Sequence, residues 1–199
     1  MKIIRGVALV LAGVMILALI AAAFMPETLR VERSIVINRP VDEVFDQVAD
    51  LNNWLAWNPW SELDPEAVNE ISTPSRGRGA QWTWEGDKIG KGHLVQEEIE
   101  EDKMVRFTLA FEEPMQSTGT DLWQFDSLDS RTTRVVWADE MALDYPVGRL
   151  SALFIGPAME EQFDKGLMNL KRLLESQRRV EPAPAAPAPI NDTAVIQGT

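Results

Sequence analysis

The stretch MEEQFDKGLMNLKRLLE (159–175) decides the fold. Its large apolar side chains recur at intervals of three and four residues, and they are Met159, Phe163, Leu167, Leu170 and Leu174. Gly166 lies on the same side, and most of the charged residues lie off this stripe. Such spacing predicts a long amphipathic helix over residues 152–178. A helix of this kind must pack its apolar face on another apolar surface.

The segment before this helix supplies such a surface, because the pattern of residues 67–142 changes to period two. The clearest stripes are Ala80, Trp82 and Trp84 in one run, and Val105, Phe107, Leu109 and Phe111 in another. Gly-rich, Asp-Ser and Glu-Glu-Pro segments separate the runs, which predicts consecutive antiparallel hairpins. We therefore expect the long helix to lie on an antiparallel sheet.

A strand and two short helices are expected before these hairpins. LRVERSIVIN (29–38) alternates between apolar and polar residues, as a half-buried strand does. RPVDEVFDQVAD (39–50) has helical spacing on its apolar face, and Pro40 suits the first turn of a helix. A second short helix is predicted through Trp54 and Trp57, and Asn58-Pro59 is expected to stop it.

This order of elements, with the phrases VERSIVINRPVDEVFDQVADLNNWLAWNPW (31–60) and MEEQFDKGLMNLKRLLE (159–175), resembles the polyketide cyclase/dehydrase-like branch of the START-related SRPBCC superfamily. The resemblance covers roughly residues 30–177. It implies an α+β helix-grip fold, in which a curved antiparallel sheet wraps around a long C-terminal helix. In this superfamily the wrapped interior often holds an apolar molecule.

Composition excludes several classes of function. The formal net charge is −12, which repels phosphate backbones, so we expect no nucleic-acid partner. The chain has no cysteine, which excludes disulfides, thiolate nucleophiles and Cys-based metal sites. His93 is the single histidine, so a multi-histidine metal site is excluded as well. We expect neither a metal nor a cofactor.

The first residues, MKIIRGVALVLAGVMILALIAAAFM (1–25), form a membrane-anchor candidate. An apolar run extends from Val7 to Met25, and as a helix it is just long enough to span a bilayer core of about 30 Å. A cleaved signal peptide is the alternative, with Ala21-Ala22-Ala23 as small residues for a peptidase. Apolar regions of signal peptides are usually shorter, about 7–15 residues. We therefore favour an uncleaved transmembrane anchor over residues 1–26, with residues 3–25 in contact with lipid.

The orientation of this anchor is read from its basic flanks. Lys2 and Arg5 precede the apolar run, and Arg30 and Arg33 follow it, so positive charges are equal in number on both sides. A short basic N-terminus before a first apolar segment most often stays in the cytoplasm. We therefore expect a single-pass protein of the cell membrane, with the folded domain (27–180) outside the cytoplasm.

The last stretch, EPAPAAPAPINDTAVIQGT (181–199), alternates proline and alanine and has few large apolar side chains. It cannot bury enough surface to offset the entropy lost on ordering. We expect a disordered tail.

Tryptophan is concentrated in this chain. Trp54, Trp57 and Trp60 fall within NNWLAWNPW (52–60), where they either pack a short helix against the sheet or form the rim of a cavity. Core packing is favoured for Trp54 and Trp57, and both alternatives stay open for Trp60. Four further residues, Trp82, Trp84, Trp123 and Trp137, lie on predicted strands and either fill the interior or line it. The resemblance favours lining, and Phe163 and Leu167 of the long helix join these ligand-binding candidates.

Two carboxylates share strand faces with these indoles, Asp121 with Trp123 and Asp139 with Trp137. If they face the interior, burial raises their pKa and suits them to binding or to proton transfer. A shift of register or a bulge would instead turn each to solvent, and the acidic composition favours this alternative. His93 has no identifiable carboxylate partner in the sequence and is expected at the surface.

Three functions follow. The favoured one is a membrane-tethered domain that binds a hydrophobic small molecule or lipid in an internal cavity. The second is a polyketide cyclase/dehydratase-like enzyme, which we disfavour because the sequence offers no convergent His/Asp/Tyr set. The third is a protein-interaction module, which predicts a filled interior and an exposed apolar patch.

Overall fold

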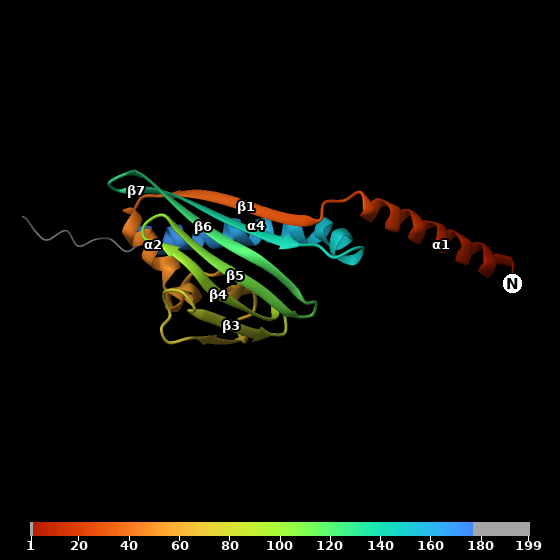
Figure 1. Cartoon of the computed structure of the whole chain (residues 1–199), viewed down its shortest axis with the longest axis horizontal. Helices are drawn as coiled ribbons and strands as arrows, with labels where there is room; N and C mark the ends of the chain where they lie inside the picture. Colours follow the sequence, from red (N-terminus) through yellow and green to blue (C-terminus); the bar gives the residue numbers. More distant parts are fainter. Residues whose placement is uncertain (1, 177–199) are drawn as a thin grey trace, which may run out of the picture.

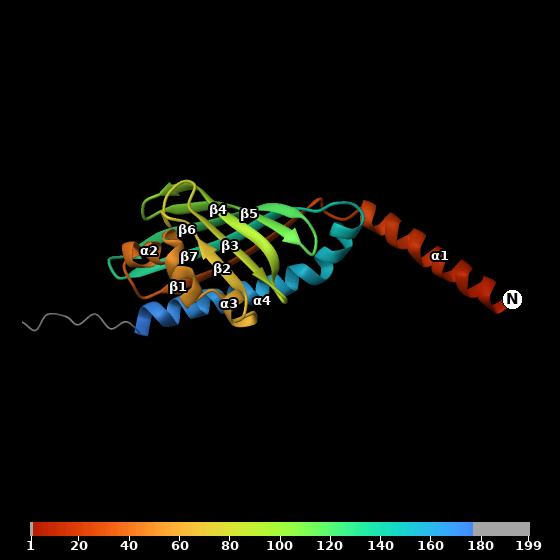
Figure 2. The same ribbon diagram turned by 90° about the horizontal axis from the view of Figure 1, so that it is seen from below.

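A computed structural model describes residues 2–176 of the chain (Figures 1 and 2). Seven strands form one antiparallel, curved sheet in the order β1-β7-β6-β5-β4-β3-β2. The strands are β1 (Thr28–Ile37), β2 (Val68–Ile71), β3 (Gln81–Gly86), β4 (Gly90–Glu100), β5 (Met104–Glu113), β6 (Ser117–Asp129) and β7 (Thr132–Ala142). The helices are α1 (Lys2–Ala23), α2 (Val41–Ala49), the 3-10 helix η1 (Leu51–Ala56), α3 (Pro59–Leu63) and α4 (Val147–Ser176). This is the expected α+β helix-grip fold with an N-terminal apolar helix.

The first strand, β1, pairs with the last strand, β7, at one edge of the sheet. It pairs with β7 along its whole length, from Thr28 opposite Ala142 to Ile37 opposite Thr133. Figure 2 shows α4 running along the sheet, and its contacts with β1 place its apolar stripe over the interior. All five residues of the predicted stripe are at most 7% exposed, as expected.

Helix α4 begins at Val147, five residues before the expected start, and it continues through Pro157. Proline in a helix removes one backbone hydrogen bond and usually marks a boundary. The sequence-based start at 152 was late, because the first turns of α4 are largely exposed and carry no buried apolar stripe that periodicity could detect.

The prediction that Asn58-Pro59 stops a helix was only half right. Helix η1 ends at Ala56, but Pro59 is the first residue of α3. The Asn58 side chain accepts a hydrogen bond from the Trp60 backbone N–H at 2.8 Å and caps α3. A proline suits this first helical position, since its missing N–H would have no partner there.

We expect Gly166→Ala to destabilise the protein by about 1–3 kcal/mol, although alanine usually gains about 1 kcal/mol over glycine within a helix. A Cβ at this position would lie 2.9 Å from Pro59 Cδ and 3.0 Å from Trp137 Cζ3, both on rigid rings. Thermal unfolding of the full chain in detergent, followed by tryptophan fluorescence, measures the effect. Lys165→Ala is the matched control, because Lys165 forms a solvent-exposed ion pair with Glu62. A more stable Gly166→Ala variant would contradict this packing.

Helix α1 projects away from the domain (Figure 1). It contains Ile3–Ala23, the one stretch among residues 2–176 that is long and apolar enough to cross a membrane, with a mean hydropathy of 2.7. The expected tail (181–199) lies outside the described residues.

Candidate functional site

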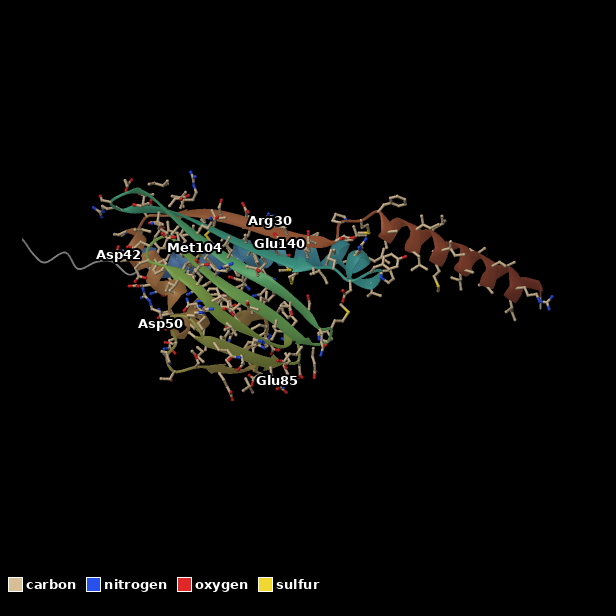
Figure 3. All side chains as sticks on the ribbon, in the orientation of Figure 1. Arg30, Asp42, Asp50, Glu85, Met104 and Glu140 are labelled. Carbon is tan, nitrogen blue, oxygen red and sulfur yellow. The ribbon has the colours of Figure 1, made fainter. Side chains whose placement is uncertain are left out.

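Asp121 on β6 and Asp139 on β7 lie directly opposite each other, and each is 3% exposed. The expectation that they face solvent was wrong. The irregularity in the β6–β7 pairing falls between Ser127 and Asp129, so the alternation of faces is unbroken at the two carboxyls. On the outer face of the sheet, Arg30 pairs with Glu140 (Figure 3), which leaves the neighbouring Asp139 facing inward.

The two carboxyl groups are incompletely hydrogen-bonded. Trp137 Nε1 donates to Asp121 Oδ2 at 2.9 Å. The other oxygen of Asp121, Oδ1, and Oδ1 of Asp139 are buried without a well-formed hydrogen bond to any described residue. The indole N–H of Trp57 also lacks a partner among the described residues, and that of Trp123 interacts with Asp121 without the geometry of a good hydrogen bond. Four buried polar atoms in one aromatic interior therefore have unused hydrogen-bonding capacity.

Burial also changes the proton affinity of this pair. Desolvation raises the pKa of Asp121 to about 7, against the opposing effect of the hydrogen bond from Trp137. Desolvation, followed by repulsion from the Asp121 charge, raises the pKa of Asp139 well above its usual range. Both carboxyls therefore hold their protons more tightly than an exposed aspartate does, and a protonated carboxyl of the pair can donate a hydrogen bond.

Around the pair, the aromatic side chains pack against one another. The Trp137 ring stacks on those of Trp123 and Phe163, at centroid distances of 4.4 and 3.9 Å. Trp54 contacts four rings at 5.2–5.9 Å, those of Trp57, Trp82, Phe107 and Trp123. The described rings therefore fill the interior, and they do not line the open pocket that the resemblance favoured.

The candidate residues differ in burial. Core packing is confirmed for Trp54 and Trp57, which are 2% and 1% exposed, and Trp54 Nε1 donates to the Val48 carbonyl at 2.8 Å. Trp60 is half-buried at the edge of the core. The remaining candidates are at most 6% exposed, namely Trp82, Trp84, Trp123, Trp137, Phe163 and Leu167.

The interior is less tightly closed at the end that faces α1. Two residues along the strands from the carboxyl pair, in the next inward-facing row, Leu29, Met141, Gly119 and Leu109 lie across β1, β7, β6 and β5. We call this row the mouth row. Met141 and Leu109 are each 7% exposed, whereas Trp123 and Phe107, deeper in the sheet, are fully buried. Strand periodicity placed Leu109 on an apolar face, but it gave no signal that these four residues form one row, because the row depends on strand register.

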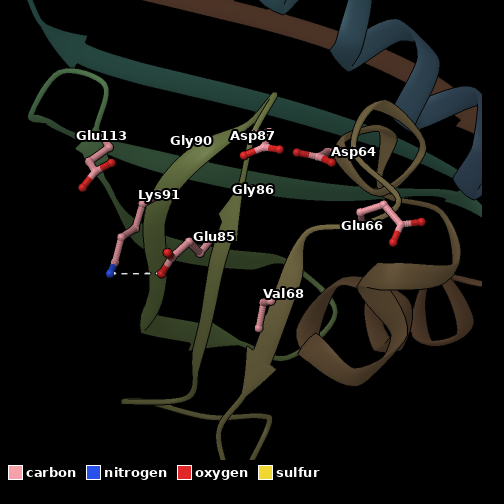
Figure 4. A pocket seen from close by; sticks show the side chains of 9 residues that line it. All are labelled: Asp64, Glu66, Val68, Glu85, Gly86, Asp87, Gly90, Lys91 and Glu113. Atoms are coloured by element: carbon pink, nitrogen blue, oxygen red, sulfur yellow. Dashed lines mark ion pairs between the residues drawn. The ribbon is translucent and has the colours of Figure 1, made fainter.

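The two best-formed cavities of the described residues lie outside this interior. The larger has a volume of about 480 Å³ and is lined mainly by carboxylates, among them Asp64, Glu66, Asp87 and Glu113 (Figure 4). In it, Lys91 pairs with Glu85 at 3.2 Å. The smaller, of about 180 Å³, lies between the segment that follows α1, the start of β1 and the first turns of α4.

His93 lies on the outer face of β4, away from the carboxyl pair. Contrary to expectation it has a carboxylate partner, since its Nδ1 lies 3.1 Å from Glu112 Oε1. The side chain is about a third exposed, so its location near the surface agrees with the prediction. It does not join the candidate site.

The fold is widespread among solved structures. A protein from Chromobacterium violaceum is 16% identical, with a TM-score of 0.54, over 76% of this chain and 99% of its own. A protein from Thermobifida fusca is 17% identical, with a TM-score of 0.58, over 75% of this chain and 95% of its own. The Aha1 dimer from Colwellia psychrerythraea is 15% identical, with a TM-score of 0.53, over 73% of this chain and 96% of its own. At such identities these likenesses show the fold alone.

No protein of curated function is significantly similar in sequence to the chain. A family model does match, over residues 28–175, and this range includes the seven-stranded sheet, nearly all of α4 and the carboxyl pair. The chain belongs to the polyketide cyclase/dehydrase and lipid transport family, whose fold binds hydrophobic ligands.

Proposed function

We propose that this protein is a membrane-tethered domain that binds an uncharged hydrophobic molecule or lipid in the interior between the sheet and α4. A hydroxyl or keto group of the ligand would lie at Asp121 and Asp139. The observation that carries the proposal is the buried carboxyl pair, because one oxygen of each carboxyl and the nearby indole N–H groups of Trp57 and Trp123 lack a well-formed hydrogen bond. Each such atom costs about 1–3 kcal/mol when nothing satisfies it. A core built for stability alone would have apolar groups there.

The chemistry of the pair favours a neutral polar group on the ligand. Protonated Asp139 can donate a hydrogen bond, and the free oxygens of both carboxyls can accept one. An anionic head group would be repelled by Asp121 once that carboxyl ionises, and also by the net charge of −12. An alcohol or ketone on an apolar skeleton satisfies these groups without that repulsion.

Binding requires side chains to move, because the interior is filled. Met141 of the mouth row and Met159 of α4 are each 7% exposed and have flexible side chains that can repack. Gly119 leaves a gap in the same row that Met141 fills, since a Cβ there would lie 2.5 Å from Met141 Cγ. A ligand that displaces these methionines reaches the carboxyl pair in the next inward-facing row.

The tether belongs to the same proposal. Helix α1 has the length and composition of a membrane span, and a tethered domain meets apolar molecules leaving the bilayer at high local concentration. In this arrangement the protein is a single-pass protein of the cell membrane, with the domain outside the cytoplasm.

A second function, proton-transfer catalysis of the cyclase/dehydratase kind, is favoured by one observation. The pKa of Asp121, about 7, lies near neutral pH, where a general acid or base works best. Asp121→Asn keeps a polar group for binding and removes proton transfer. Turnover that is lost while binding is kept would assign this second function.

We expect native mass spectrometry of the full chain, purified gently from its own membranes, to show a discrete extra mass. This mass should stay with the domain after proteolytic removal of α1. In the double variant Asp121→Leu/Asp139→Leu, occupancy should fall about tenfold, the effect of losing one hydrogen bond. Glu140→Gln, one residue from Asp139 but on the outer face, is the matched control and should keep its ligand. A bare wild-type domain would sink the proposal.

A further inference from the structure

The first turns of α4 expose an apolar surface that the helix-grip core does not use. Val147 is 60% exposed, Leu153 60% and Phe154 79%. Tyr145, just before the helix, is 52% exposed, and Phe24, just after α1, is 87% exposed. We call these five residues the shoulder. Large apolar groups gathered at one place on a surface mark a contact with a partner or a membrane.

Polar contacts hold the shoulder against the end of α1. The Tyr145 hydroxyl donates to the Leu19 carbonyl oxygen at 3.1 Å. Arg149 forms an ion pair with Glu27 at 2.7 Å, and its guanidinium also lies 3.5 Å from the carbonyl oxygens of Ala22 and Met25. Figures 1 and 2 both show the first turns of α4 beside the C-terminal end of α1.

The length of α1 sets the depth of this contact. Its 22 residues extend about 33 Å, close to the thickness of a bilayer core of about 30 Å. When α1 spans the bilayer, Leu19 to Met25 therefore lie at the boundary between acyl chains and head groups. Residues held against them lie at the same level, where tyrosine and arginine are favoured.

We infer that the shoulder is a second lipid-contacting surface, whose apolar side chains insert into the leaflet next to the domain. The inference rests on the tether of the proposed function. The 180 Å³ cavity supports a lipid occupant, because Met25, Pro26, Leu29 and Leu153 give it an almost wholly apolar wall beside Arg149. The acidic domain offers no electrostatic attraction to anionic lipid, so insertion depends on apolar area and proceeds in neutral phosphatidylcholine.

This contact fixes the orientation of the domain relative to the membrane. Leu29 belongs both to the wall of the cavity and to the mouth row, so the less tightly closed end of the interior faces the leaflet. An apolar molecule that leaves the leaflet at the shoulder then meets Met141 and the carboxyl pair without crossing bulk water.

The absence of native cysteine allows a direct test with single-cysteine nitroxide labels in the full chain. Phe154→Cys reports on the shoulder, Leu11→Cys on the middle of α1, and Leu128→Cys on the β6–β7 hairpin at the far end of the sheet (Figure 1). Each variant is placed in phosphatidylcholine nanodiscs, one copy per disc. Electron paramagnetic resonance then measures collisions with oxygen, which concentrates in lipid, and with a water-soluble nickel complex.

We expect the label at residue 154 to show several-fold fewer nickel collisions and more oxygen collisions than the label at residue 128. If the label at 154 behaves like that at 128 while residue 11 lies in lipid, the shoulder does not contact lipid, although α1 still anchors the protein. Protection from nickel without a gain in oxygen access would mean that protein covers residue 154, which also overturns the inference. A water-exposed residue 11 would contradict both the membrane anchor and the lipid contact of the shoulder.

Discussion

Replacing both buried carboxyls by leucine, in Asp121→Leu/Asp139→Leu, should make the protein more stable at pH 8 by at least about 2 kcal/mol. In the wild type, Asp121 ionises near pH 3.8 in the unfolded chain and near pH 7 in the folded one. Between these values the folded state binds more protons, so the free energy of unfolding falls as pH rises. The fall is about 4 kcal/mol from Asp121 alone. Leucine has a similar shape and nothing to ionise.

The pH dependence separates this effect from ordinary packing. At about pH 3 the folded and unfolded carboxyls are both largely protonated, and the advantage of the variant should shrink or reverse, because Trp137 Nε1 loses its acceptor. Chemical denaturation of the full chain in detergent at several pH values measures the difference between the two proteins, in which contributions of the other acidic residues cancel. Glu140→Gln should keep the wild-type slope. Equal slopes of stability against pH for the variant and the wild type would refute the raised pKa values.

Phe163→Ala should cost about 3–5 kcal/mol of stability, the largest loss we expect from a single substitution. The Phe163 side chain is fully buried and stacks on Trp137 with nearly parallel planes, 5° apart. Its removal leaves a cavity where α4 meets the sheet. Phe154→Ala on the same helix is the matched control, because that ring is 79% exposed and should change stability by less than about 0.5 kcal/mol.

Thermal unfolding in detergent, followed by near-UV circular dichroism, compares the two phenylalanines directly. Similar losses for both variants would mean that α4 is not seated on the sheet as described. A loss for Phe163→Ala alone would confirm that the helix is anchored by its C-terminal stripe, while its first turns stay free for the shoulder.

The sequence predicts the framework of this fold because periodicity reports directly on which face is buried. The stripe from Met159 to Leu174 and the alternation from Val105 to Phe111 both occur as expected. Helix boundaries were less well predicted. Pro59 begins a helix that Asn58 caps, although the sequence suggested that it ends one, and the exposed first turns of α4 carry no buried stripe.

The candidate site could be predicted only in part. Strand phase placed Asp121 and Asp139 beside inward-facing tryptophans, but the acidic composition argued for solvent, and the unbroken register decided otherwise. Whether indoles fill or line an interior depends on sheet curvature and on the position of α4, which periodicity does not contain. The mouth row and the shoulder likewise arise from elements far apart in the sequence, such as Leu29 with Met141 and Tyr145 with Leu19.

The central claim is that a hydrophobic ligand reaches the carboxyl pair, and fluorine NMR of protein labelled with fluorotryptophan tests it most directly. The probe is the apolar lipid extract of the source membranes, added to ligand-stripped protein, with resonances assigned by single Trp→Phe variants. We predict that Trp123 and Trp137, which interact with Asp121, shift or broaden, and that Asp121→Leu/Asp139→Leu requires about tenfold more extract for the same change. Unchanged Trp123 and Trp137 resonances, or a response confined to half-buried Trp60, would contradict the account.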